Sequence, residues 1–312
     1  MPTGDIPLLL FTLIMATIFP LILPDFLLIA LGALLLHRFH FSRDFFQGAE
    51  KLVYYVLFPA LLFDSITRIP LNLGDTWPLL VAAAVLIAVG TVLAWLALPI
   101  LKPEHLQHAA LTQCAFRFNT YLGMSLASAI AGPSGVAVMA LLVGFSVPMA
   151  NMVAVTVLAR GQQGRIAIEL LKNPLILSTV AALAWNLAGL SVPGPIQLAF
   201  SRLGACALGI GLLCVGATLS LQGSRRAGAL IGWITAIKLL ALPLAALAIA
   251  WVLDMSTLER QMLLVFAALP TASSAHVLAA RMGADSRLVA LTMSIGTILA
   301  GLTIPLWLSL AT

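Results

Sequence analysis

The chain has 312 residues, of which 62% are apolar and 9% are charged, and its mean hydropathy is +1.10. A water-soluble globular protein does not carry so apolar a composition, so the chain is predicted to be an integral membrane protein. The net charge of +5 does not indicate a nucleic-acid partner, because basic residues in a membrane protein first report its orientation.

Ten apolar runs follow one another along the chain, each long enough for a helix that crosses about 30 Å of hydrocarbon. No alternating pattern of the kind that forms membrane strands is visible. The runs are residues 18–36, 47–67, 78–100, 106–131, 134–159, 174–192, 197–220, 228–252, 259–281 and 286–310. Because a backbone in lipid must satisfy its own hydrogen bonds, we predict an all-α polytopic membrane protein with ten transmembrane helices.

Basic residues concentrate in alternate loops, which sets the expected orientation. The loops after the first, third, fifth, seventh and ninth runs carry Arg38, Arg43, Lys51, Lys102, Arg160, Arg165, Lys172, Arg225, Arg226, Arg281 and Arg287. The opposite loops carry only Arg68, Arg202 and Arg260. The positive-inside rule therefore predicts that both termini lie outside the cytoplasm.

The second half of the chain is similar to the first. "AGPSGVAVMALLVGFSVP" resembles "MGADSRLVALTMSIGTILAG", and in each half a polar fourth run is followed by a turn glycine, Gly132 or Gly283, and a fifth run with Gly144 or Gly296. Five spans is an odd number, so the two repeats are predicted to have inverted topology. The expected divisions are an N-terminal extension (1–17), repeat 1 (18–159), a cytoplasmic linker (160–173) and repeat 2 (174–312).

Polar residues interrupt the fourth and ninth runs at matching depth. Pro270 removes a helix hydrogen bond in the middle of "FAALPTASSAHVLAA", and Thr271, Ser273 and Ser274 can cap the freed half-helix. Asn119 lies equally centrally in the fourth run. Coincident breaks favour a substrate site where the two broken helices meet, and the alternative is a simple kink at Pro270.

Two basic residues, Arg117 and Lys238, lie deep within apolar runs, whereas the acidic residues lie in loops or near the ends of runs. A buried basic residue costs about 2.5–3.5 kcal/mol on insertion scales, so each needs a partner. The C-terminal end of a broken helix and an anionic substrate are the two candidates. The excess of basic over acidic residues deep in the apolar runs predicts an anionic substrate, namely a small carboxylate.

Enzyme chemistry has little support, because the chain contains no HExxH, no pair of intramembrane aspartates and no Gly-x-Ser-x-Gly elbow. Three cysteines, Cys114, Cys206 and Cys214, show no paired spacing, so neither a metal site nor a cofactor is expected. His276 is the only imidazole deep in a run; it is either a hydrogen-bonded packing residue or a proton relay.

Several stretches, in this order along the chain, resemble the auxin efflux carrier family, which includes bacterial malonate-type permeases and the plant PIN-formed auxin exporters. The stretches are "LGALLLHR", "VLFPALLF", "FRFNTYLG", "PMANMVAV", "LKNPLIL", "GLLCVGATLSL", "KLLALP" and "LPTASSAHVLAARMG". The plant exporters carry Asn-Pro-Asn-x-Tyr at the fourth span. Asn119 and Tyr121 match this motif, whereas Arg117 and Phe118 depart from it, and Asn151 resembles a family asparagine that faces the substrate.

The resemblance implies an elevator-type carrier of organic anions, in which spans 1, 2, 6 and 7 form a scaffold and the others a transport domain with crossing broken helices 4 and 9. A homodimer through the scaffold helices and a location in the bacterial cytoplasmic (inner) membrane are also expected. The candidate substrate-binding residues are Arg117, Asn119, Thr120, Tyr121, Asn151, Pro270, Thr271, Ser273 and Ser274, with Lys238 for charge balance.

We therefore expect a secondary active or facilitative transporter of small organic anions, either mono- or dicarboxylates or auxin-like weak acids. Its expected partners are the substrate and the lipid bilayer. The alternatives are a sodium-coupled organic anion carrier like the bile acid symporters and a membrane-embedded enzyme.

Overall fold

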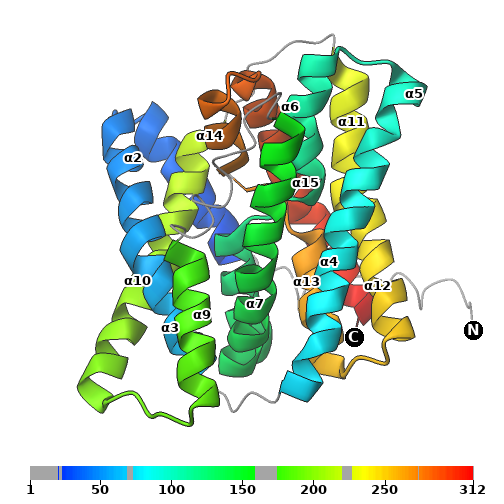
Figure 1. Cartoon of the computed structure of the whole chain (residues 1–312). Helices are drawn as coiled ribbons and strands as arrows, with labels where there is room; N and C mark the ends of the chain where they lie inside the picture. The colour runs from blue at the N-terminus through cyan, green and yellow to red at the C-terminus, as the bar shows by residue number, and fades with distance from the viewer. Residues whose placement is uncertain are drawn as a thin grey trace, which may run out of the picture.

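The computed structural model describes residues 20, 23–68, 73–158, 174–219, 227–272 and 274–311 (Figure 1). The predicted extension at 1–17 and the predicted linker at 160–173 lie outside this set. The described residues form helices joined by short turns, and none of them is in a strand. Each of the ten predicted apolar runs is mainly helical where it is described, which confirms the all-α fold class.

The helices are Leu23–His37, α2 (Arg43–Leu52), the π-helix η1 (Val53–Leu57), α3 (Phe58–Thr67), α4 (Leu73–Trp95), α5 (Ala97–Leu101), α6 (His105–Phe116), α7 (Thr120–Leu158), α9 (Pro174–Leu187), α10 (Gly194–Thr218), α11 (Gly228–Ala236), the π-helix η4 (Ile237–Ala241), α12 (Leu242–Val252), α13 (Thr257–Ala268), α14 (Ser274–Arg281) and α15 (Ser286–Ala311).

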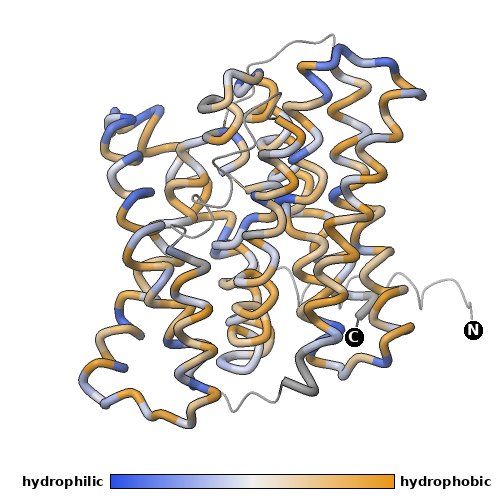
Figure 2. The backbone as a smooth tube through the Cα atoms, in the orientation of Figure 1, coloured by the Kyte–Doolittle hydropathy of each residue, from blue (hydrophilic) through white to orange (hydrophobic). Residues whose placement is uncertain are grey.

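Five described segments are long and apolar enough to cross a membrane. They are Trp77–Leu101, His105–Leu158, Gly194–Thr218, Gly228–Val252 and Ser286–Ser309. Apolar residues run along most of the helical length, and hydrophilic residues gather mainly towards the helix ends (Figure 2). This distribution is that of an integral membrane protein, whose helix flanks contact lipid tails and whose ends contact water.

The helices pack as two groups that meet along α7. The first group contains α2, η1, α3, α9 and α10, and the second contains α4, α6, α11, η4, α12, α13, α14 and α15. In Figure 1 the first group lies on the left of α7 and most of the second on the right. Since α7 packs against α3, α9 and α10 as well as α4, α6 and α13, its side chains form much of the boundary between the groups.

The helix Leu23–His37 joins the first group through close contacts of its backbone with α10. A Cβ atom built at Gly216 would overlap the carbonyl oxygen of Ile29, and one built at Gly32 would overlap that of Leu213. Glycine, which has no side chain, allows the two helix backbones to come this near each other. Small residues have the same role at other helix crossings in membranes.

The two turns predicted at Gly132 and Gly283 are confirmed. Gly132 has φ +55° and interrupts α7, so that α7 consists of two helical parts. Gly283 has φ +70° between α14 and α15. Both conformations are left-handed and favour glycine. Of the paired glycines further on, Gly144 packs against Thr179 of α9, whereas Gly296 has open space beside it.

The close crossing at Gly216 predicts a strong effect of one added methyl group. Gly216→Ala should lower the free energy of unfolding by about 1–3 kcal/mol, because overpacking forces the two backbones apart. The measurement is the thermal unfolding of the detergent-purified protein, followed by tryptophan fluorescence. Gly209→Ala is the matched control, since Gly209 lies on the same helix and a Cβ there meets nothing within 4 Å. Equal melting temperatures for the two variants would contradict the close crossing.

Candidate functional site

The chain leaves helical geometry at both predicted breaks. Helix α6 ends at Phe116, Arg117 is extended (φ −71°, ψ 149°), and α7 begins at Thr120. Helix α13 ends at Ala268, followed by Leu269 with φ −59° and ψ 141°. Pro270 explains the second break, because proline has no backbone N–H to continue the series of helical hydrogen bonds.

The first break has no proline, and Asn119 provides the start of the new helix instead. Its side-chain Oδ1 accepts a hydrogen bond from the Leu122 backbone N–H at 3.2 Å. Asparagine is among the preferred residues at a helix N-cap, where it replaces a missing backbone acceptor. Phe118, which stands where the plant exporters have proline, packs its ring against Phe266 of α13 with centroids 4.4 Å apart.

The two breaks contact each other and exchange hydrogen bonds. The Asn119 backbone N–H donates to the Pro270 carbonyl oxygen at 2.8 Å, and the Thr271 hydroxyl donates to the Cys114 carbonyl oxygen at 2.8 Å. Gln113 Nε2 donates to the Ala275 carbonyl oxygen at 3.2 Å. Backbone groups that lose their helical partners at one break thus find partners at the other, within an apolar bundle.

The place where the α6–α7 break and the α13–α14 break contact each other is called the crossing below. Arg117 lies at this crossing with only 5% of its surface exposed. One terminal nitrogen donates to the Ser274 hydroxyl at 2.9 Å, and the other donates to Asn151 Oδ1. Three residues predicted separately from the sequence are therefore in contact, and they come from the α6–α7 break, the second part of α7 and the start of α14. Both acceptors are neutral, so they orient the guanidinium without neutralising its charge.

Several polar atoms at the crossing are buried and have no hydrogen-bond partner among the described residues. They are Arg117 Nε, Asn119 Nδ2 and Gln113 Oε1. Two of these atoms are donors, and a buried donor without a partner is costly. The crossing therefore keeps two N–H groups available in addition to a positive charge.

Lys238 is 3% exposed and lies in the π-helix η4. Its Nζ donates to the Ala267 carbonyl oxygen at 3.2 Å, in the last turn of α13. Carbonyl groups at a helix C-terminus attract a cation, so Lys238 has the helix-end partner that the sequence argument offered as one of two candidates. Arg117, in contrast, has no such partner among its described contacts.

The remaining predicted residues lie around the crossing to different extents. Thr120 is the half-buried first residue of α7, and the Tyr121 ring packs edge-on against Phe58 of α3 with centroids 5.3 Å apart. His276 is half-buried, with Nδ1 2.9 Å from the Ser286 carbonyl oxygen. Its role as a proton relay stays a prediction. Ser273 lies outside the described residues.

Two residues of the first helix group were missed by the sequence argument. Tyr54, in η1, lies within electrostatic range of Arg117, and Glu50, in α2, lies within electrostatic range of Tyr121. Single π-helical turns are frequent at functional sites, because the extra residue redirects side chains. The available signal was "EKLVYY", a charged and aromatic stretch at the start of an apolar run.

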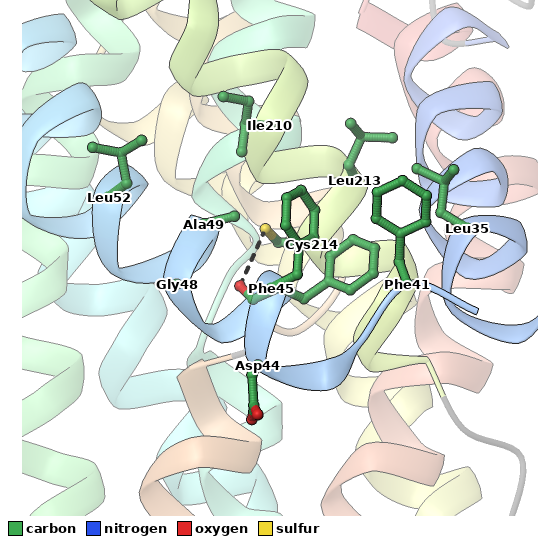
Figure 3. A pocket seen from close by; sticks show the side chains of 11 residues that line it. Leu35, Phe41, Asp44, Phe45, Gly48, Ala49, Leu52, Ile210, Leu213 and Cys214 are labelled. Atoms are coloured by element: carbon green, nitrogen blue, oxygen red, sulfur yellow. Dashed lines mark hydrogen bonds between the residues drawn. The ribbon is translucent and has the colours of Figure 1, made fainter. Parts of the chain in front are cut away.

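A separate apolar pocket of about 500 Å³ lies between α2, α10 and the helix Leu23–His37 (Figure 3). Phe41, Phe45, Leu52 and Leu213 are among its lining residues, and Cys214 at its base donates to the Phe46 carbonyl oxygen at 3.8 Å. None of the crossing residues lines it. The pocket is therefore distinct from the candidate site.

Comparison with known proteins identifies similarities over nearly the whole chain. A family model described as "Membrane transport protein" matches residues 17–169 and 162–308. The "Putative malonate transporter" of Rhizobium meliloti (strain 1021) is 29% identical over 313 residues, which cover 93% of this chain and 94% of that protein. The "Uncharacterized transporter YfdV" of Escherichia coli (strain K12) is 25% identical over 305 residues, covering 92% and 95%. These names point to a transporter rather than an enzyme.

The hydrogen bond from Thr271 to Cys114 generates a stability prediction. Thr271→Val keeps the shape of the side chain but loses a bond between the two breaks, so the free energy of unfolding should fall by about 0.6–1.7 kcal/mol. Thr292→Val is the control, because the buried Thr292 hydroxyl bonds only the Leu288 carbonyl within its own helix. Thermal unfolding in detergent measures both, and a larger loss in the control would contradict the crossing contact.

Proposed function

The chain belongs to the membrane transport protein family, the auxin efflux carrier family that its sequence resembles, and on that basis we propose that it is a secondary active or facilitative transporter of small organic anions. The observation that carries this proposal is the buried Arg117, held between two broken helices by Ser274 and Asn151. Mono- and dicarboxylates are the substrates with matching charge and size.

Electrostatics at the crossing favours an anion. Arg117 has two neutral acceptors, and its positive charge is balanced by no carboxylate among its described hydrogen bonds and ion pairs. Two helices, α7 and α14, also begin at the crossing, and helix N-termini carry partial positive charge. A carboxylate placed between them would accept from Arg117 Nε and Asn119 Nδ2, the two donors that lack partners.

The packing of the helices suggests how access alternates. The second helix group, with both breaks, would move as a transport domain against the first group along α7, in an elevator-type mechanism with two inverted five-helix repeats. Tyr121 and Asn151 both belong to α7, so the candidate site would travel with that helix. The first group would be the scaffold and the surface of a homodimer, in the bacterial inner membrane with both termini outside.

Malonate is the first substrate to test, because the Rhizobium meliloti relative is named for it. Malonate should raise the melting temperature of the purified protein, since a ligand that binds only the folded state stabilises it. Asn119→Ala should abolish this shift by removing the helix cap and one free donor. The assay extends to lactate and other carboxylates, and the absence of a shift across the whole panel would overturn the proposal.

Arg117→Gln tests the charge at the site. A hydrogen bond to a charged group is worth about 1.5–3 kcal/mol, so the affinity for malonate should fall by roughly 10- to 150-fold. Isothermal titration calorimetry measures the change directly. Arg202→Gln makes the same substitution at an exposed position of α10 and should leave the affinity unchanged. Equal losses in the two variants would show that net charge, not the crossing, governs binding.

A further inference from the structure

Asp25 is a buried carboxyl group away from the crossing residues described above. It is 5% exposed and lies near the start of the described part of the helix Leu23–His37. Its Oδ1 accepts a hydrogen bond from the Ser125 hydroxyl of α7 at 2.6 Å. Its Oδ2 is buried without a hydrogen-bond partner in the described part of the chain. One oxygen of the carboxyl group thus accepts a hydrogen bond, and the other has no partner among the described residues.

The position of this hydrogen bond connects the two helix groups. The helix Leu23–His37 is held against α10 of the first group by the contacts at Gly32 and Gly216. Ser125 lies on α7, six residues after Asn119, a separation of about 9 Å along a helix. Movement of α7 against the first group would therefore separate Ser125 from Asp25 and change the exposure of the carboxyl to water.

No described cation contacts Asp25. Helix α7 contains no Asp, Glu, Lys, Arg or His, and Tyr121 is its only tyrosine. Helix α15, whose Gly301 lies beside Phe26, has one charged residue, Arg287, 14 residues before Gly301 and so about 21 Å along the helix. The other titratable groups on the elements packed here are His37 on the same helix and Arg202, Cys206 and Cys214 on α10.

The chemistry of the site suits a neutral carboxylic acid. Removing an ionised carboxylate from water without a cationic partner is strongly unfavourable. A protonated carboxyl group has no charge to compensate; it accepts a hydrogen bond at its carbonyl oxygen and has a single O–H group. Here the Ser125 hydroxyl donates to Oδ1, which leaves Oδ2 as the oxygen that carries the proton.

We propose that Asp25 is the proton-coupling residue of this transporter. The carboxylate takes one proton from water onto Oδ2 when helix Leu23–His37 and α7 are packed together, and it releases that proton to water when movement of α7 exposes it. A proton bound more tightly in one of two conformations biases the equilibrium between them, and the coupling is reciprocal. This inference rests on the proposed function and adds to it the identity of the coupled ion.

The test uses the full-length protein in proteoliposomes, with radiolabelled malonate and the membrane potential clamped. A gradient of one pH unit should drive about tenfold accumulation if one proton accompanies each substrate. Asp25→Asn should abolish this accumulation but retain exchange of internal for external malonate. Asp64→Asn is the matched control, because Asp64 is a buried carboxylate within the first group, paired with Arg68 at 3.0 Å, and should retain pH-driven accumulation.

A pH dye enclosed in wild-type vesicles makes the test independent of how well the variant folds. Net malonate uptake into these vesicles should carry protons with it. Net malonate uptake without proton movement, accumulation driven by sodium alone, or undiminished pH-driven accumulation by Asp25→Asn would each overturn the assignment of Asp25 and leave the transport proposal intact. Wild-type vesicles that exchange no carboxylate at all would overturn the proposed function itself.

Discussion

Backbone groups in an apolar bundle need hydrogen-bond partners, and two helices broken at mid-depth meet this requirement by crossing. The bond from Asn119 to Pro270 and the bond from Thr271 to Cys114 each join one break to the other. Neither break can provide hydrogen-bond partners for its own free backbone groups, so the position of each break depends on the other. Arg117 and Lys238 are placed by the same crossing: Lys238 meets the end of α13, and Arg117 meets the start of α14.

The two π-helices show a second use of irregular backbone. Each carries a side chain to the crossing from a neighbouring helix: Tyr54 from η1 lies within range of Arg117, and Lys238 from η4 contacts Ala267. They belong to different helix groups, so the crossing is enclosed from both sides of the boundary along α7.

Much of the architecture could be predicted from sequence because it depends on local properties. Apolar runs identify the helices, Pro270 marks one break, and Gly132 and Gly283 mark the turns. The contacts between helices could not be predicted in this way. They join residues far apart in the chain, such as Asp25 and Ser125, and no spacing rule relates such residues. Asp25 lies close to the end of an apolar run, and this position does not predict its burial, because burial depends on what packs alongside. The break at Asn119 could be located but its geometry could not, since its helix cap depends on a single side chain.

The acceptors of Arg117 have a further consequence. Its guanidinium is already removed from water and oriented by Ser274 and Asn151 before any cargo arrives. The dehydration of this cation is thus completed when the protein folds, and the proposed anionic substrate would have only its own hydration shell to lose. Such preorganisation favours ligands whose shells are easily removed. Discrimination among anions would then follow the ease of their dehydration as well as their shape.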